Sequence, residues 1–278
     1  MGVSVTADTP SLGSVIQLVT PSESAQLIGA AEFMAASPDP FFMPGGPITV
    51  LLLHGYTGSP AELLLLAKAL HDQGFAVEAP LLAGHGTCLE DLMPVQPRQW
   101  LEQIDAVIQR LQNDGQRVVV AGLSLGSILA IQAGMRHPAV EAVIAYSPPI
   151  VSGDRRALIA PLLSLVLPSV PRPADDFVDP AMAERVWKYP SWPSRCSVRV
   201  LRLIASTRRH LRDLHQPLMV IASKRDKVIT RRGVELLRHR SGSEDVLVHW
   251  LEDSGHAITT DAQWQTVADQ TLLFLKGL

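Results

Sequence analysis

The feature that most constrains this chain is the pentapeptide GLSLG at residues 122–126, which has the form G-x-S-x-G. The β-branched stretch before it, residues 117–121, predicts a fully buried parallel strand. The Ala-, Ile- and Leu-rich stretch after it, residues 127–135, predicts a helix. On so sharp a strand-to-helix turn, Ser124 presents its hydroxyl at the carboxyl edge of the sheet, and the two glycines relieve crowding. An accidental pentapeptide in a helical hairpin is the alternative, and it leaves the valine-rich strand unexplained.

Strand and helix patterns alternate along most of the chain. Short aliphatic runs predict buried strands at 48–53, 74–80, 117–121, 140–146, 217–222 and 246–251. Helices are predicted from residue 59 to about 71, around 100–111, at 127–135, at 231–240 and after Asp261. Ser59-Pro60-Ala61-Glu62 indicates a capping box for the first of these helices, and Asp261 a cap for the last. The alternation, with 47% hydrophobic residues, predicts an α/β fold whose mostly parallel central sheet is flanked by helices.

The composition excludes several classes of protein. A net charge of −3, with no clear tract of Lys and Arg, gives no sign of nucleic-acid binding. Cys88 and Cys196 could form one disulfide at most. No signal-peptide pattern opens the chain, and the longest apolar run, residues 157–167, is interrupted by Pro161 and too short to span a bilayer. The sequence therefore predicts a soluble, cytoplasmic protein without a transmembrane segment.

The alternation divides the chain into three parts. Residues 1–38, rich in Ser, Ala, Thr and Pro, are expected to form an N-terminal extension that is partly ordered at best. Residues 39–149 and 213–278 carry the strand and helix rhythm of the core. Residues 150–212 interrupt that rhythm with prolines, leucines and aromatic residues. Because this insertion leaves from the carboxyl edge of the sheet, it is expected to cap the serine, the alternative being a helical decoration remote from it.

A serine hydroxyl needs a base to take its proton, and the base needs an anion to hold its orientation. In a sheet of this kind both groups come from loops after later strands, the acid before the histidine in the chain. Asp226 directly follows the fifth predicted strand, and His256 follows the sixth. Asp253 is a rival acid, but its place in the same turn as His256 favours a role in bracing that turn. We predict that Ser124, Asp226 and His256 act as one set.

Two backbone amides are predicted to face the oxygen of a substrate carbonyl. The amide of Leu125 opens the helix after the serine, where the helix dipole favours negative charge. The second comes from the turn at His54-Gly55-Tyr56, which places the amide of Tyr56 there. His54 itself is expected to brace this turn through hydrogen bonds. Acyl transfer at such a site needs no metal or organic cofactor, and no group of His, Cys, Asp or Glu has convincing metal-ligand spacing.

Several motifs together resemble the small bacterial carboxylesterases and monoacylglycerol lipases of the α/β-hydrolase fold. They are HGYTGSP at 54–60, GHG at 84–86, GLSLG at 122–126, Asp226 and SGH at 254–256. The resemblance covers roughly residues 40–278 and is looser in the insertion. It leaves the N-terminal extension uncovered.

The resemblance implies a role for each matching residue: a catalytic triad at Ser124, Asp226 and His256, and oxyanion-hole amides at Tyr56 and Leu125. It implies carboxylic esters with short to medium acyl chains, or monoacylglycerols, as substrates, and transient contact with a lipid surface is compatible with them. The group commonly has phenylalanine at Tyr56, a difference without effect if only the backbone acts. It usually has glycine at Ser127, so helix packing there is expected to be slightly less close.

Other proteins could use the same machinery. A thioesterase, an acyltransferase or a cofactor-free perhydrolase stays open, because water, alcohols and peroxide compete for the same acyl-enzyme. A hydrolase-fold binding protein without turnover is a further alternative, although such proteins typically lack a triad member. Ser124 argues against epoxide hydrolases and haloalkane dehalogenases, which use an aspartate nucleophile. The leucine and aromatic content of the insertion favours an apolar acyl pocket.

Overall fold

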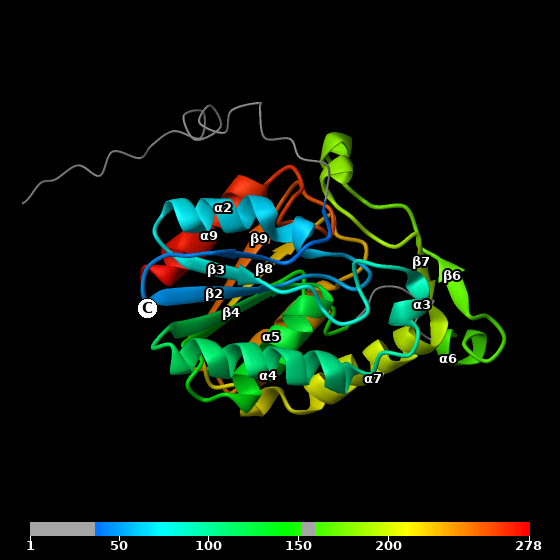
Figure 1. Cartoon of the computed structure of the whole chain (residues 1–278), viewed down its shortest axis with the longest axis horizontal. Helices are drawn as coiled ribbons and strands as arrows, with labels where there is room; N and C mark the ends of the chain where they lie inside the picture. The colour runs from blue at the N-terminus through cyan, green and yellow to red at the C-terminus, as the bar shows by residue number, and fades with distance from the viewer. Residues whose placement is uncertain (1–36, 152–158) are drawn as a thin grey trace, which may run out of the picture. The chain divides into compact units, whose positions relative to one another are not determined.

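The computed structural model describes residues 37–151 and 159–278 (Figure 1). By its internal contacts the chain divides into two units, residues 1–34 and residues 35–278. All but two residues of the predicted N-terminal extension, and residues 152–158 of the insertion, lie outside the described residues. The described residues all belong to the second unit.

A seven-stranded sheet forms the centre of this unit. Its strand order is β1-β3-β2-β4-β5-β8-β9, and every neighbouring pair is parallel except β1 with β3. The strands are β1 (Phe41–Met43), β2 (Ile48–Leu53), β3 (Ala76–Ala79), β4 (Arg117–Leu123), β5 (Ala142–Tyr146), β8 (Leu218–Ser223) and β9 (Val246–Leu251). This confirms the mostly parallel sheet and the six predicted strands. The edge strand β1 was not predicted, because three residues are too few to show a period-two pattern.

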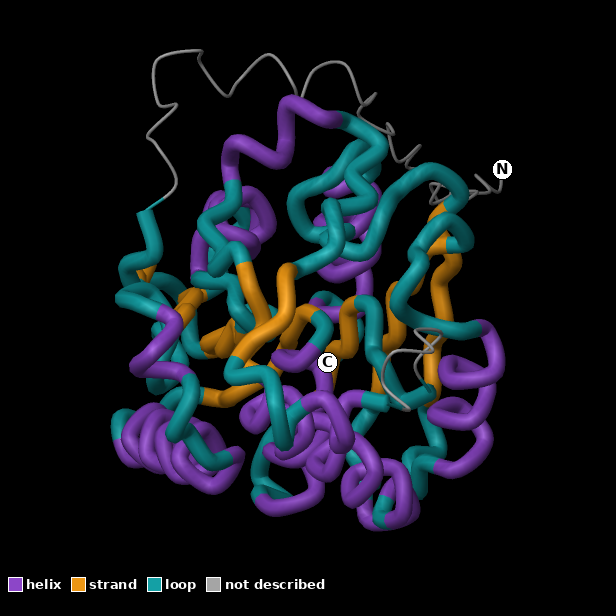
Figure 2. The backbone as a smooth tube through the Cα atoms, turned by 90° about the vertical axis from the view of Figure 1, so that its right-hand side faces the viewer, coloured by secondary structure: helices purple, strands orange, loops and turns teal. Residues whose placement is uncertain are grey.

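Helices cover both faces of the sheet, as Figures 1 and 2 show. Successive residues of a strand point to opposite faces, so Leu51 and Leu53 enter one buried cluster and Val50 and Leu52 the other. The first cluster lies under α4 (Pro97–Asn113), α5 (Leu125–Arg136), α7 (Ser194–Arg209) and α8 (Arg231–Arg240), and the second under α2 (Leu64–Asp72) and α9 (Trp264–Leu275). Among the described residues, no helix is long and apolar enough to cross a membrane.

Two predicted helix caps are wrong. The first helix opens as the 3-10 turn η1 (Pro60–Leu63), and Ser59 makes no side-chain capping bond. Glu62, the other half of the predicted capping box, directs its carboxylate to the amide of Gly55 instead. The last helix begins at Trp264, three residues after Asp261, so Asp261 does not cap it. In both places a carboxylate that could cap a helix binds loop amides instead.

The insertion, residues 150–212, connects β5 to β8. Its described elements are α6 (Ala160–Leu163), β6 (Ser169–Pro171), η3 (Pro180–Arg185), β7 (Ser191–Pro193), α7 and η4 (Leu211–Asp213). Strands β6 and β7 form a separate antiparallel pair. Helix α7 packs against α4 and α5, so the second half of the insertion joins the helix layer below the sheet in Figure 1. The short helix α3 (Leu89–Leu92) belongs to the loop between β3 and α4. Both cysteines are free thiols.

Candidate active site

Ser124 lies on a strained turn between β4 and α5. Its backbone has φ 55° and ψ −112°, a left-handed conformation that non-glycine residues rarely adopt. A Cβ atom on Gly126 would lie 1.9 Å from the carbonyl oxygen of Leu53, and one on Gly122 would lie 2.2 Å from the carbonyl carbon of Gly126. Only glycine fits at these two positions, which explains the G-x-S-x-G spacing physically. The turn raises the serine hydroxyl above the carboxyl edge of the sheet.

Backbone strain in the described residues concentrates around this edge. Three non-glycine residues there have positive φ: Thr57 after β2, Ser124 after β4 and Ser147 after β5. Such conformations cost on the order of 1–3 kcal/mol each and persist only where their surroundings enforce them. The carboxyl ends of three neighbouring strands are therefore built for a purpose other than stability.

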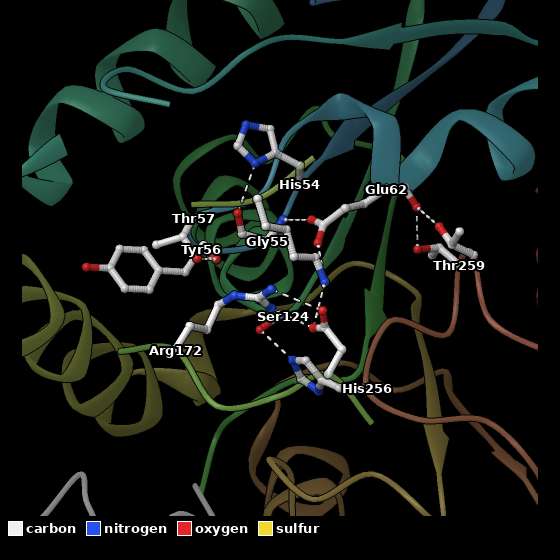
Figure 3. Close-up of polar contacts among 12 residues, drawn as sticks. His54, Gly55, Tyr56, Thr57, Glu62, Ser124, Arg172, His256 and Thr259 are labelled. Atoms are coloured by element: carbon white, nitrogen blue, oxygen red, sulfur yellow. Dashed lines mark hydrogen bonds and ion pairs between the residues drawn. The ribbon is translucent and has the colours of Figure 1, made fainter. Parts of the chain in front are cut away.

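The structure brings the three predicted side chains into one hydrogen-bonded chain. His256 Nε2 lies 2.8 Å from Ser124 Oγ (Figure 3). On the other side of the ring, His256 Nδ1 lies 2.7 Å from Asp226 Oδ2. Ser124 follows β4, Asp226 follows β8 and His256 follows β9. Asp253, the rival acid, forms a surface ion pair with Arg225 instead. The acid that reaches the histidine comes from the loop after the neighbouring strand β8, and not from the loop of His256 itself.

Asp226 and His256 shift each other's pKa so that the carboxylate is ionised and the imidazole binds its proton more tightly. The side chain of Asp226 is fully buried, and burial raises the pKa of its carboxyl. The charge and hydrogen bond of His256, together with two backbone amides, lower that pKa by more than burial raises it. Burial lowers the pKa of His256, and the charge and hydrogen bond of Asp226 outweigh it, so the net pKa is raised. With Asp226 ionised, the imidazole carries its proton on Nδ1 and leaves Nε2 to accept from the serine hydroxyl.

The two predicted oxyanion amides stand beside the serine. Tyr56 belongs to a tight turn in which the Gly58 amide donates to the Gly55 carbonyl at 3.2 Å. Leu125 is the first residue of α5, where a helix leaves its amides without intrahelical acceptors. Within the described part of the chain, neither the Tyr56 amide nor the Leu125 amide donates to a protein acceptor. Both are available to an incoming oxygen.

A buried carboxylate that sequence reasoning missed holds the turn at Tyr56. Glu62 Oε2 accepts the Gly55 amide at 2.9 Å, while its Oε1 lies 3.1 Å from Lys188 Nζ of the insertion. The backbone carbonyl of Glu62 accepts the hydroxyls of Thr259 and Thr260, each at 2.7 Å (Figure 3). Glu62 therefore joins the turn at Tyr56, the insertion and the segment after His256. The S-P-A-E pattern gave no sign of this, because a helix cap accounts for it equally well.

Two buried histidines brace the same turn. His54 Nε2 accepts the Leu82 amide at 3.1 Å, and His85 Nε2 accepts the Thr57 amide at 3.2 Å. Burial lowers the pKa of His54 to about 4 and that of His85 to about 3. Both rings are therefore neutral near pH 7, as their role as acceptors requires. The expected bracing role of His54 is confirmed, and His85 is a second brace that the GHG motif marked without revealing its partner.

The insertion contacts the turn at Tyr56 and the segment that carries His256. The Tyr56 hydroxyl donates to the Pro193 carbonyl at 3.3 Å and lies 3.1 Å from Ser197 Oγ. The Tyr189 amide donates to the Thr57 carbonyl at 2.8 Å. Asp261 accepts the amides of Val178 and Asp179 in the insertion, of Gly255 beside His256, and of its own neighbour Ala262. The sequence showed none of these contacts, because the insertion has no periodic pattern.

A strained serine turn, a hydrogen-bonded Ser-His-Asp chain and two open amides on a mostly parallel sheet are typical of one class of protein. The chain is a serine hydrolase of the α/β-hydrolase fold. The family model for serine aminopeptidases of the S33 type, Hydrolase_4, matches residues 48–263. The chain belongs to this family.

Relatives and solved structures agree with this assignment. The chain is 26% identical over 246 residues to a carboxylesterase of Bacillus subtilis (strain 168), covering 87% of this chain and 98% of that protein. It is 27% identical over 241 residues to a thermostable monoacylglycerol lipase of Bacillus sp. (strain H-257), covering 85% and 93%.

Two solved structures share the fold. One comes from work on two metagenome-derived lipolytic enzymes, LipS and LipT, with a TM-score of 0.82, 23% identity, and 88% and 100% coverage of this chain and that one. The other is a monoacylglycerol lipase of Paleococcus ferrophilus, with a TM-score of 0.72, 18% identity, and 85% and 98% coverage. The protein is thus a hydrolase related to carboxylesterases and monoacylglycerol lipases.

Proposed function

We propose that this protein hydrolyses carboxylic esters through a covalent acyl-enzyme, with Ser124 as nucleophile, His256 as general base and Asp226 as the acid that orients it. One observation carries the proposal: His256 bridges Ser124 Oγ and Asp226 Oδ2 at 2.8 and 2.7 Å, on a serine whose turn is strained. A structural serine needs neither the strain nor a histidine paired with a buried carboxylate.

The mechanism follows from the geometry. Ser124 Oγ attacks the ester carbonyl carbon while His256 Nε2 takes the hydroxyl proton. The amides of Tyr56 and Leu125 stabilise the oxyanion, and each such donor is worth about 3–4 kcal/mol of barrier. The carbon–oxygen bond to the alcohol then breaks, and His256 returns the proton to the departing alcohol. Water repeats the two steps on the acyl-enzyme, which releases the carboxylic acid and restores Ser124.

The insertion is proposed to cap the serine and to shape the acyl site. Its contacts with Tyr56, Thr57 and Glu62 support this role, since each lies beside the proposed oxyanion hole. The names of the two Bacillus relatives, a carboxylesterase and a monoacylglycerol lipase, support carboxylic esters or monoacylglycerols as substrates. Among the esters, we propose those with short to medium acyl chains.

Transient contact with lipid is proposed for the first part of the insertion. This stretch exposes five large aliphatic side chains by 42–75% of their surface: Ile159, Leu162, Leu165, Val166 and Leu167. Exposed apolar clusters of this kind mark surfaces that meet other apolar matter. Sedimentation with phosphatidylcholine vesicles, for the native protein and for Leu165→Ser with Val166→Ser, tests this contact.

The function is tested by hydrolysis of p-nitrophenyl esters from acetate to palmitate, by the native protein and by Ser124→Ala. Native turnover with an optimum at short to medium chains, and its loss in the variant, is the expected result. The matching family model is described as serine aminopeptidases, so an aminoacyl p-nitroanilide is tested beside the esters to compare cleavage of an amide with cleavage of an ester. Turnover of the anilide alone, or ester turnover that survives in Ser124→Ala, contradicts the proposal.

A further inference from the structure

Asp176 of the insertion binds both loops that carry the proposed acid and base. It lies between β6 and η3, and its Oδ1 accepts the backbone amide of His256 at 2.8 Å. Its Oδ2 accepts the backbone amide of Lys227, the residue after Asp226, at 3.2 Å. The neighbouring carboxylate of Asp175 binds Arg172 and Lys188 instead. Of this adjacent acidic pair, only Asp176 faces the triad loops.

The bond to the His256 amide completes the support of the histidine backbone. The carbonyl of His256 accepts the hydroxyl of Ser147 at 2.9 Å, so Ser147 holds the carbonyl of this residue and Asp176 holds its amide. The side-chain bond between His256 and Asp226 runs between the same two loops. Asp176 therefore adds a second bridge, made to backbone, parallel to the side-chain bridge of the triad.

The fit between the two segments is close. A Cβ atom on Gly255 would lie 2.1 Å from the carbonyl oxygen of Asp176, so no side chain fits at position 255. Asp261 binds the same stretch of the insertion. Its carboxylate accepts the amides of Val178 and Asp179 at 3.0 Å and also the amide of Gly255. A displacement of Asp176 would therefore move the backbone of Gly255 and His256.

Charge gives Asp176 a second influence on the histidine. The charged groups that face His256 are Asp226 from the loop after β8, Asp176 from the insertion and Lys188 ahead of β7. Burial lowers the pKa of His256, Asp226 raises it most, Asp176 raises it further, and Lys188 lowers it. Removing the charge of Asp176 alone therefore lowers the pKa of His256.

We propose that Asp176 is a positioning residue of the hydrolytic reaction, which fixes the backbones of the His256 and Asp226 loops so that His256 Nε2 stays within reach of Ser124 Oγ. The inference rests on the proposed function. It makes the insertion a structural part of the triad as well as its cover.

The experiment compares Asp176→Ala and Asp176→Asn with Asp179→Ala in ester hydrolysis. Asp179 is a matched control, because it lies in the same stretch and its carboxylate accepts the Ala181 amide within the insertion. For each folded variant, kcat and KM are measured across pH 5 to 9, together with Tm. Native turnover and its loss in Ser124→Ala establish the proposed function separately.

Asp176→Ala is expected to lower kcat by roughly 10–100-fold, the cost of a catalytic group held about 1 Å out of place, with KM changed less than about 3-fold. Asp176→Asn keeps one acceptor and is expected to lose less kcat. Both variants are expected to move the acid limb of kcat/KM to lower pH, since both lose the charge. A role in folding alone lowers Tm without moving that limb.

The proposal is overturned if the native protein hydrolyses esters and both Asp176 variants have the same kcat, and the same acid limb of kcat/KM, as the control variant Asp179→Ala. If Asp176→Ala fails to fold, the pH profile of Asp176→Asn is the test. An acid limb of kcat/KM at the native pH in Asp176→Asn then overturns the proposal. Absence of native turnover instead contradicts the proposed function.

Discussion

Lys188 Nζ lies 3.1 Å from Glu62 Oε1, and the two side chains are only 11% and 4% exposed. The second carboxylate oxygen of Glu62 accepts the amide of Gly55, the residue before the proposed oxyanion donor Tyr56. A cation of the insertion thus neutralises the carboxylate with which the core holds its oxyanion turn. The buried pair therefore joins the insertion to the turn at Tyr56.

Replacing Glu62 by alanine is expected to lower the free energy of unfolding by about 3–5 kcal/mol, because it removes one partner of a buried ion pair and the acceptor of a buried amide. Urea unfolding of the native protein and the variant measures this. Glu252→Ala is the control, since Glu252 pairs with Lys224 on the surface at 69% and 56% exposure. A surface pair of this kind is worth at most about 1 kcal/mol. Equal losses in the two variants would contradict a structural role for the buried pair.

Tyr56→Phe tests whether only the backbone of this residue acts in catalysis. The variant loses the hydroxyl bonds to Pro193 and Ser197 and keeps the amide. We expect the free energy of unfolding to fall by about 1 kcal/mol, the net value of such bonds, and kcat to stay within about 3-fold of native. Steady-state kinetics and urea unfolding measure both. A more than tenfold loss of kcat with unchanged stability would assign the hydroxyl a direct role.

The buried histidines predict an acid-sensitive fold. His54 has a pKa of about 4 in the folded protein against an ordinary value of 6.5, so the unfolded chain takes up a proton first as pH falls. The stability that neutral His54 contributes is complete above pH 6.5 and is lost as pH falls toward 4. Urea unfolding at pH 7 and pH 4.5 is expected to differ by about 2–3 kcal/mol from His54, with a further loss from His85.

His54→Gln provides the comparison for this pH dependence. It is expected to flatten the stability profile between pH 7 and 4.5, while His239→Gln, at a ring that is 70% exposed, leaves the profile unchanged. An equal slope in the native protein and His54→Gln would mean that His54 is charged in the fold.

The glycines of the serine turn predict a steric test. Gly126→Ala places a methyl group 1.9 Å from the Leu53 carbonyl oxygen and is expected to cost about 3 kcal/mol or more of stability, at the upper end of overpacking. Gly115→Ala is the control, because its φ is +78° and nothing lies within 4 Å of the new methyl. Its cost is the conformational one of about 1–2 kcal/mol. Thermal unfolding compares the two, and a similar Tm in both would contradict the close approach at the turn.

Much of the core followed from the sequence because its signals are local. Strand β9 and helix α8 have the predicted bounds, since aliphatic runs and helical periodicity depend on neighbouring residues alone. Asp226 and His256 could be proposed together because the carboxyl ends of parallel strands meet at one edge. Their positions after β8 and β9 then needed no knowledge of distance.

The parts that escaped prediction are contacts that no local sequence pattern encodes. Glu62 and Asp261 match helix-cap patterns locally, yet their carboxylates bind the amides of Gly55 and Val178, and only the folded chain brings those amides near. Asp176 is one of two adjacent acidic residues in a stretch without periodicity, so nothing in the sequence distinguishes it from Asp175. Charged groups that join separate loops leave no local pattern to read.

The central claim, that Ser124 is a nucleophile activated by His256, is tested most directly by labelling with a fluorophosphonate and mapping the adduct by mass spectrometry. We predict one adduct, on Ser124, absent in Ser124→Ala and formed far more slowly in His256→Ala. An unlabelled Ser124 in folded native protein, or labelling of Ser124 at the native rate without His256, would contradict this claim.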